Sequence, residues 1–217
     1  MDLKDNEVLT PPCRLAVASL FAPTPKHPTT PTEVRYQATV LIPPGLDMTP
    51  FSKAINAAMV EKWGKTIPLE GRAMPLKKAD GKTTQDGRPY SGFEPGWFTL
   101  KAMNRYAPQI VDQAKRPILD VAANADEDAI ARATSAAEAR VYSGCWCRFY
   151  VRAFAWDNAS GKGVSFSLEA VQLVKDDEAF AGKKQASDLF ETIDTGDAGP
   201  PADGEVEGGD PLAGLLG

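Results

Sequence analysis

Runs of apolar and alternating residues predict that most of this chain forms β-strands. Side chains on a strand point alternately to the two faces of a sheet, so a period of two marks a strand with one buried face. The last two runs flank residues 157–162 (DNASGK), which predicts a β-hairpin with a loop longer than the minimal two-residue turn. Strands are expected at residues 13–21, 34–43, 97–106, 145–156 and 163–174.

A different pattern, typical of helices, occurs at two places. Residues 49–64 offer Thr49 as an N-cap and Pro50 at the first helical position, and Gly64 ends the segment. Residues 126–141 are rich in alanine and predict a second, short helix inserted before the last hairpin. Dominant strands with one capped helix between them favour a mainly β fold, a small five-stranded barrel with loop insertions, over a sandwich or a doubly wound sheet.

The strand expected at residues 145–156 has an unusual outward face. Its odd-numbered positions are apolar and mostly small, as the inside of a narrow barrel requires. Its even-numbered positions combine four aromatic rings with two arginines, a surface that is costly to expose unless something covers it. Stacked bases with arginine near their phosphates would use all six side chains, whereas a packed helix or a partner subunit is the alternative. The outward residues are Trp146, Arg148, Tyr150, Arg152, Phe154 and Trp156.

Basic and aromatic residues recur on the outward faces of other expected strands. In residues 97–106 the apolar face consists of Phe98, Leu100, Ala102 and Tyr106. A groove that follows a flexible, stackable, anionic strand would need basic and aromatic residues on the opposite face. Further candidate contacts are therefore Trp97, Lys101 and Arg105 on this strand, Arg35 on the strand at residues 34–43, and Lys162 in the hairpin loop.

The net charge of −5 conceals an uneven distribution. Residues 185–217 hold eight acids and neither Lys nor Arg, which leaves 24 basic and 21 acidic residues, a net +3, in residues 1–184. The acidic end is rich in Gly and Pro and is expected to be disordered. A mildly basic body with an acidic tail indicates nucleic-acid binding, with the tail recruiting partners or competing for the basic surface. A tail that only improves solubility is the alternative.

Candidate catalytic chemistry is sparse. Cys145 and Cys147 could supply two zinc ligands, but Cys13 and His27 lie far away in sequence and the spacing of common zinc modules is absent. The cysteines are therefore expected to be small, buried and reduced. Residues 158–163 (NASGKG) lack the first glycine and the Ser or Thr of a phosphate-binding loop. One histidine and scattered acids support neither a nucleophilic triad nor a metal-dependent nuclease, so we expect no catalytic residue, metal or cofactor.

Several segments in combination resemble a bacteriophage single-stranded DNA-binding protein family. The Tyr-Ser-Gly-Cys start, the Asp-Asn turn with Gly-Lys-Gly and the Val-Gln-Leu-Val ending all lie within residues 141–182, and SDLFETID follows at residues 187–194. Upstream, the resemblance includes CRLAVASLFAP, YQATVLIP with the helix that ends in KWG, DGRPYSGFEPGWFTLKAMNR and RPILD, so it covers most of residues 12–194. The alanine-rich segment at about 123–139 and the long tail, which ends in Leu-Leu-Gly, depart from the family pattern.

The resemblance implies an OB-fold that binds single-stranded DNA without strong sequence preference, in phage replication and recombination. We therefore expect a non-enzymatic DNA-binding domain at residues 1–194 and an acidic tail at residues 195–217 that competes for the DNA-binding groove or recruits replication or recombination proteins. The polar N-terminus and the absence of a long apolar stretch predict a cytoplasmic protein, in the host bacterium if phage-encoded, with no membrane partner. A protein-interaction module that uses the same aromatic and arginine face is the alternative function, and an enzyme acting on DNA ends is a third.

Overall fold

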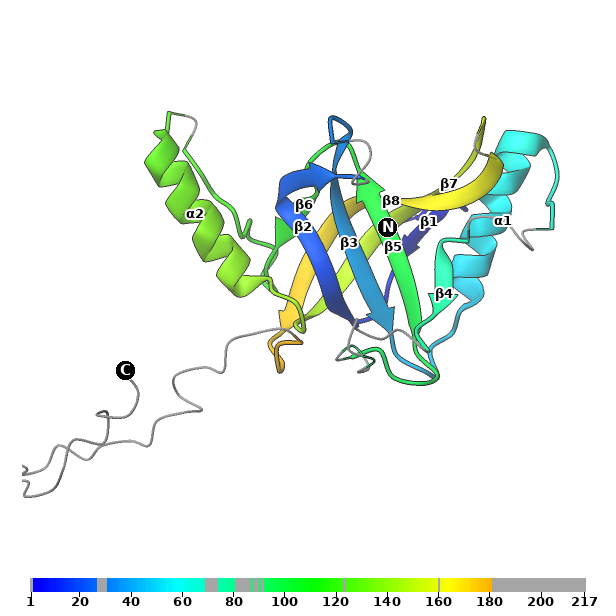
Figure 1. Cartoon of the computed structure of the whole chain (residues 1–217), viewed down its shortest axis with the longest axis horizontal. Helices are drawn as coiled ribbons and strands as arrows, with labels where there is room; N and C mark the ends of the chain where they lie inside the picture. Colours follow the sequence, from blue (N-terminus) through cyan, green and yellow to red (C-terminus); the bar gives the residue numbers. More distant parts are fainter. Residues whose placement is uncertain are drawn as a thin grey trace, which may run out of the picture. The chain divides into compact units, whose positions relative to one another are not determined.

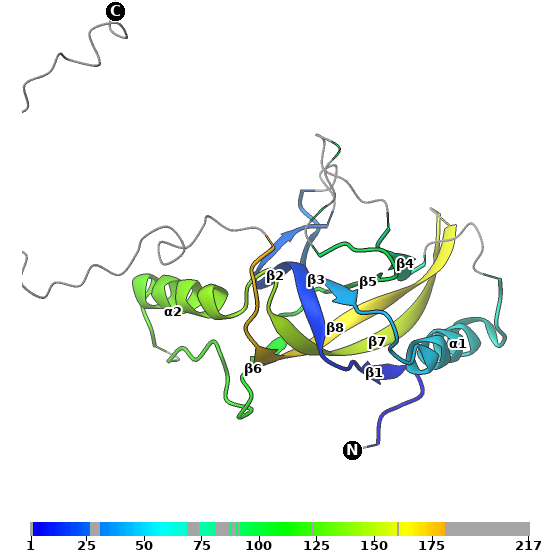
Figure 2. The ribbon, with the colours of Figure 1, turned by 90° about the horizontal axis from the view of Figure 1, so that it is seen from below.

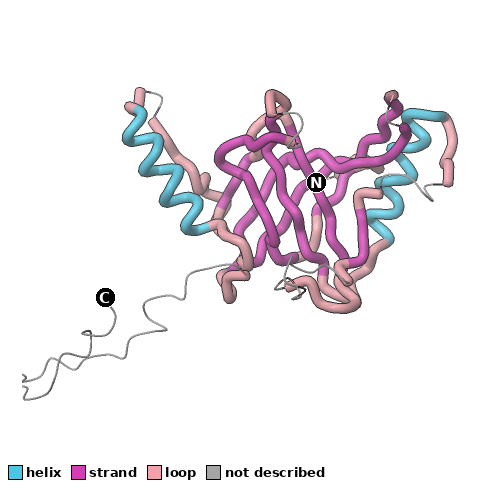
Figure 3. Tube along the Cα trace, in the orientation of Figure 1, coloured by secondary structure: helices cyan, strands magenta, loops and turns pink. Residues whose placement is uncertain are grey.

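Five long strands form the body of the protein, as the sequence pattern predicted (Figures 1 and 3). The computed structural model describes residues 2–26, 31–68, 74–80, 87, 90, 92–122, 124–159 and 161–180, so the expected tail lies outside the described residues. The long strands are β2 (Cys13–Pro25), β3 (Val34–Ile42), β5 (Phe98–Asn104), β7 (Trp146–Asn158) and β8 (Gly161–Lys175).

The pairings of these strands return to the strand from which they start. β2 pairs with β3, β3 with β5, β5 with β8, β8 with β7, and β7 with β2. All of these pairs are antiparallel except β5 and β8, which are parallel where Ala102 meets Phe166. The ring closes where β2 pairs with β7, with Cys13 opposite Cys147 in the sheet. Each strand therefore directs one set of side chains to a common interior and the other set outward.

Apolar side chains fill the interior of the ring at the positions that alternation predicted. On β7, Cys147, Phe149, Val151 and Ala153 are fully buried, whereas Ala155 is half-buried. Helix α1 (Thr49–Trp63) packs against the same core, and Figure 2 shows it beside β7 and β1. Phe51 of α1 packs edge-on against Phe166 of β8, with ring centroids 6.4 Å apart. Ile55, Ala58 and Met59 are also buried, which confirms the apolar face of this helix.

The start of α1 differs from the sequence prediction by one residue. Met48 is the N-cap and makes no side-chain capping bond, and Thr49 is already helical. The Thr49 N–H donates to Oδ1 of Asp47, at 2.9 Å, so the carboxylate of a residue before the helix satisfies one of the free N–H groups of the first turn. Gly64 ends the helix as predicted, because its left-handed backbone, with φ at 71°, suits glycine.

The hairpin loop is shorter than predicted. Asn158 pairs with Gly161, so the strands extend through most of the segment that was expected to be loop. Inside that segment, Asp157 and Lys162 form an ion pair of 2.7 Å across the two strands. Because this pair links the two strands, polar residues that were predicted to form a loop are part of the paired strands β7 and β8.

Short elements complete the fold. The short strands were not predicted, whereas the predicted alanine-rich helix is confirmed as α2 (Glu127–Arg140). The side chain of Asp126 caps this helix by accepting the Ala129 N–H at 2.7 Å. In Figures 1 and 2 this helix, α2, lies on the side of the strands opposite α1. None of the helices in the described part of the chain is long and apolar enough to cross a membrane. The short elements are β1 (Glu7–Leu9), β4 (Leu76–Lys78), β6 (Gln109–Val111) and α2 (Glu127–Arg140).

Tyr106 does not share the apolar face of β5, contrary to expectation. The strand ends at Asn104, whose side-chain Oδ1 accepts the backbone N–H of Tyr106 at 3.1 Å. This local turn takes the chain out of the sheet, and the tyrosine is 75% exposed.

Candidate functional site

Six side chains project from the outward side of β7, and we call this surface the β7 face. Consecutive members are two residues apart, so they stand about 6.6 Å from one another along the strand. The β8 residues opposite them are mostly small or uncharged, which leaves room above β8 for flat groups that contact the rings of β7. The members are Trp146, Arg148, Tyr150, Arg152, Phe154 and Trp156, and their β8 neighbours include Ser165, Ser167, Ala170 and Gln172.

The rings near the hairpin are the accessible part of the β7 face. Phe154 is 42% exposed, so no described helix covers it. Trp156 is half-buried, and its indole Nε1 donates to Oγ of Ser165 at 3.0 Å, which fixes the orientation of the ring. Tyr150 is also half-buried, and loss of solvent is the main reason that its pKa lies above the ordinary tyrosine value. Phe154 and the fixed ring of Trp156 therefore present an apolar surface beside small β8 residues.

The two arginines of the β7 face lie on either side of Tyr150 and have different partners. Arg152 forms an ion pair of 3.4 Å with Glu169, and its side chain remains about half exposed. The Nε of Arg148 donates to the backbone carbonyl of Thr10 at 3.2 Å, and no described carboxylate pairs with this guanidinium. Arg148 also lines a surface hollow of about 210 Å³ together with Tyr150, Gln172 of β8 and Lys115.

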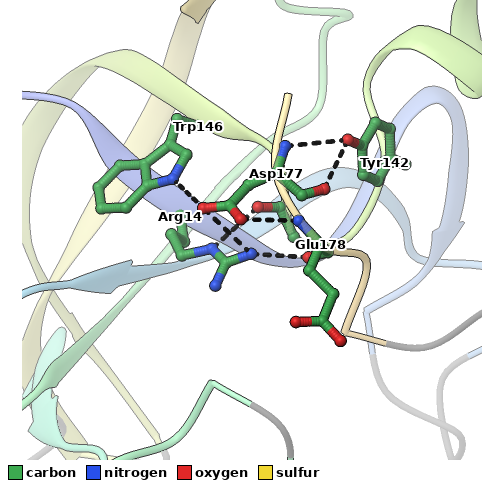
Figure 4. A network of polar contacts seen from close by, with 6 residues as sticks. Arg14, Tyr142, Trp146, Asp177 and Glu178 are labelled. Atoms are coloured by element: carbon green, nitrogen blue, oxygen red, sulfur yellow. Dashed lines mark hydrogen bonds and ion pairs between the residues drawn. The ribbon is translucent and has the colours of Figure 1, made fainter. Parts of the chain in front are cut away.

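Trp146, at the other end of the β7 face, is held in a polar network (Figure 4). Its Nε1 donates to Oδ2 of Asp177 at 2.6 Å, and Nη2 of Arg14 lies 3.6 Å from the same oxygen. Arg14 Nη2 also donates to the Glu178 carbonyl at 2.6 Å, and the Tyr142 hydroxyl donates to the Asp177 carbonyl at 2.8 Å. These contacts hold the residues that follow β8 against Trp146.

The charges around Trp146 reinforce the network. The bond from Trp146 is the largest cause that holds the pKa of Asp177 below its ordinary value, and the Glu178 N–H, Arg14 and Lys175 add to the effect. The Lys175 ammonium lies 5.2 Å from the indole centroid, and the Arg14 guanidinium carbon lies 5.9 Å from it. Trp146 thus already has cations and a carboxylate as partners, which distinguishes it from Phe154.

The other predicted site residues are dispersed. Lys101 lines a hollow that also includes Ser165, the partner of Trp156, so the structure brings it close to the β7 face. Trp97 packs instead in a separate small cluster with Ala16, Leu41 and Ala79. Arg105 is exposed and lies just beyond the end of β5. The other two residues form ion pairs, Lys162 with Asp157 at 2.7 Å and Arg35 with Glu33 at 2.6 Å.

Several cations near these surfaces were not singled out from the sequence. Arg14 and Lys175 flank Trp146, Lys77 of β4 lines the same hollow as Lys101, and Lys115 lines the hollow beside Arg148. Alternation along residues 13–21 places Arg14 on the outward face, so that residue was detectable. Lys77 was not, because β4 lies in a stretch whose composition indicated a loop.

The cysteines lie inside the ring, as expected. All three are buried free thiols, and burial raises the pKa of Cys13 to about 12, so this residue is a neutral thiol at neutral pH. The Sγ atoms of Cys145 and Cys147 are 3.5 Å apart. No group of three His, Cys, Asp or Glu side chains that could hold a metal ion occurs among the described residues.

Comparisons with known proteins place the chain in a family. The model of the family described as Enterobacter phage Enc34, ssDNA-binding protein, matches residues 6–199. Putative protein p50 of Acyrthosiphon pisum secondary endosymbiont phage 1 is 31% identical over 197 residues, which cover 86% of this chain and 90% of that protein.

Solved structures from bacteriophage Enc34 show the same fold. The single-stranded DNA-binding protein in complex with ssDNA matches with a TM-score of 0.64 and 17% identity over 82% of this chain and 91% of that chain. A second structure of the single-stranded DNA-binding protein from bacteriophage Enc34 matches with a TM-score of 0.58 and 18% identity over 87% of this chain and 92% of that chain. Together with the family match, these findings show that the chain belongs to the family described as Enterobacter phage Enc34, ssDNA-binding protein.

Proposed function

We propose that this protein binds single-stranded DNA without strong sequence preference and acts in phage DNA replication and recombination. Family membership supports this function, since the matching family is described as an ssDNA-binding protein and a protein of the same fold was solved with ssDNA. The ring of five strands, with α1 packed against its core, supports an OB-type barrel as the scaffold.

The observation that carries the proposal is the outward aromatic surface formed by the exposed Phe154 and the half-buried Trp156. Every base has a flat π-face, so stacking on such rings favours single strands of any sequence. A paired duplex keeps its bases inside and cannot stack in this way. The spacing of about 6.6 Å between alternate strand residues separates the rings enough for a base to lie on each.

Cations around the β7 face supply the contacts to phosphate. Among the described residues, Arg148, Lys101 and Arg105 have no carboxylate partner, so their charges are available to the DNA backbone. Arg152 and Lys162 are paired with Glu169 and Asp157. Exposed ion pairs of this kind contribute little to stability, so a phosphate can replace the carboxylate.

The acidic C-terminal segment has a separate role in the proposal. Residues 1–194 form the DNA-binding domain, and residues 195–217 compete for the basic surface or recruit replication or recombination proteins. Deleting residues 195–217 is therefore expected to raise DNA affinity or to abolish capture of a partner in a pull-down. If neither changes, the segment only improves solubility. The protein acts without catalysis, in the cytoplasm of the host bacterium.

Tryptophan fluorescence tests the proposed function. Oligo-dT is expected to quench the emission, and the affinity should fall as salt rises, with a slope in log K against log salt of about −0.7 for each phosphate contacted. Trp156→Phe keeps a stacking ring but removes the indole, so it should retain binding and lose part of the quenching. An absence of binding by single strands, or equal binding of duplex, would refute the proposal and favour a protein partner on the β7 face.

A further inference from the structure

A hollow of about 220 Å³ lies between β4, β5 and β8, where it includes Ser165, the β8 residue that pairs with Phe154 of the β7 face. Typical sites for small molecules have volumes of roughly 300–1,000 Å³, so this hollow suits one flat ring better than a whole cofactor. We call it the β5 pocket. Its lining includes Thr39, Met74, Lys77, Lys101, Met103 and Ser165.

The chemistry of the β5 pocket suits a nucleobase. Met74 is exposed and Met103 half-buried, and thioether sulfurs make favourable contacts with aromatic rings. Thr39 adds a hydroxyl group at the wall of the pocket. Such a combination accepts a flat ring and can satisfy polar atoms at its edge without selecting one base.

Two lysines give the pocket a positive rim. Lys77 and Lys101 are both exposed, and neither ammonium has a carboxylate partner among the described residues. These residues lie on neighbouring strands, where Lys77 pairs with Thr99 in the ladder of β4 and β5. A base in the pocket would place its flanking phosphates between two uncompensated charges, which is favourable for an anionic strand.

The β5 pocket is continuous with the β7 face. Ser165 lines the pocket, lies opposite Phe154 in the ladder, and accepts the indole hydrogen bond of Trp156 at 3.0 Å. We propose that the β5 pocket takes one base of the bound single strand, with Lys77 and Lys101 on the flanking phosphates. The DNA then leaves β7 at Trp156 and crosses β8 onto β5. This inference rests on the proposed function and extends the binding path beyond the β7 face.

Salt-dependent binding tests the phosphate contacts. Lys77→Ala and Lys101→Ala are each expected to reduce the salt slope for oligo-dT by about 0.7, because each removes one phosphate contact. When salt rises from 50 to 200 mM, the fold-loss of affinity should be about 2.6 times smaller for each variant than for the unaltered protein. Arg132→Ala, on α2, removes the same charge away from the pocket and serves as the matched control. A slope equal to that of the control in both lysine variants would overturn the inference.

Photo-crosslinking tests the position of the base. With an oligonucleotide that carries 5-iodouracil, we expect a crosslinked peptide that contains Met103 in addition to peptides from β7. Crosslinks confined to β7 would overturn the β5 pocket and leave the proposed function intact. Failure of the unaltered protein to bind oligo-dT would overturn both, so the two failures are distinguishable.

Discussion

Replacing Phe154 by alanine removes the most accessible ring of the β7 face. Stacking of one base on an aromatic ring contributes about 1–3 kcal/mol. Phe154 is 42% exposed, so a base can cover only one side of the ring, and we expect a loss in the lower part of that range, about 1–2 kcal/mol. This loss corresponds to a Kd for oligo-dT that is about 5- to 30-fold higher.

Fluorescence anisotropy of a labelled oligo-dT at fixed salt measures this change, with circular dichroism to confirm folding. Phe154→Tyr keeps the stacking ring and should bind nearly as well as the unaltered protein. Ile130→Ala removes an apolar side chain of similar exposure, 44%, from α2 and should leave the Kd unchanged. The reasoning is refuted if Phe154→Ala binds as tightly as Ile130→Ala, or if Phe154→Tyr binds as weakly as Phe154→Ala.

Two further predictions concern the network at Trp146. Gly144 has φ at 115°, and a Cβ there would lie 2.3 Å from the Glu178 carbonyl oxygen. Gly144→Ala should therefore destabilise the fold by more than about 1 kcal/mol, which lowers the Tm by at least about 2–4 °C. An unchanged Tm would contradict this contact. The pKa of Asp177 is lowered in the folded protein, so its stabilising effect is present above about pH 4 and is lost as the pH falls further. Asp177→Asn should therefore have a lower urea midpoint than the unaltered protein at pH 7, and the difference should shrink progressively as the pH falls below about 4. A difference independent of pH would show that the carboxylate charge contributes nothing.

The sequence was sufficient to predict the five long strands and the two faces of β7. Alternation is a local property of extended backbone, so the burial of Cys147, Phe149 and Val151 followed from their spacing alone. Alternation likewise predicted that Phe154 and Trp156 point outward, as they do in the structure. The apolar face of α1 was predictable for a similar reason, because helical spacing also depends only on neighbours along the chain.

Contacts between distant segments were not predictable in this way. Trp146 is bound by Asp177, which is 31 residues further along the chain, and nothing in the pattern around either residue indicates that bond. Trp97 was expected on the outward face with Lys101, but it packs with Leu41 of β3 and with Ala79, whose backbone N–H donates to the Trp97 carbonyl at 2.8 Å. The short strands β1, β4 and β6 could not be predicted for another reason, because three residues are too few to show a period.

The indole N–H signals of the four tryptophans offer the most direct test of where a single strand binds. Trp156 lies on the accessible part of the β7 face, whereas Trp97 packs in the separate cluster. In a ¹H–¹⁵N spectrum titrated with oligo-dT, with signals assigned by Trp→Phe variants, the Trp156 signal should shift most and that of Trp97 least. A Trp156 signal that stays in place while that of Trp97 shifts would contradict the account.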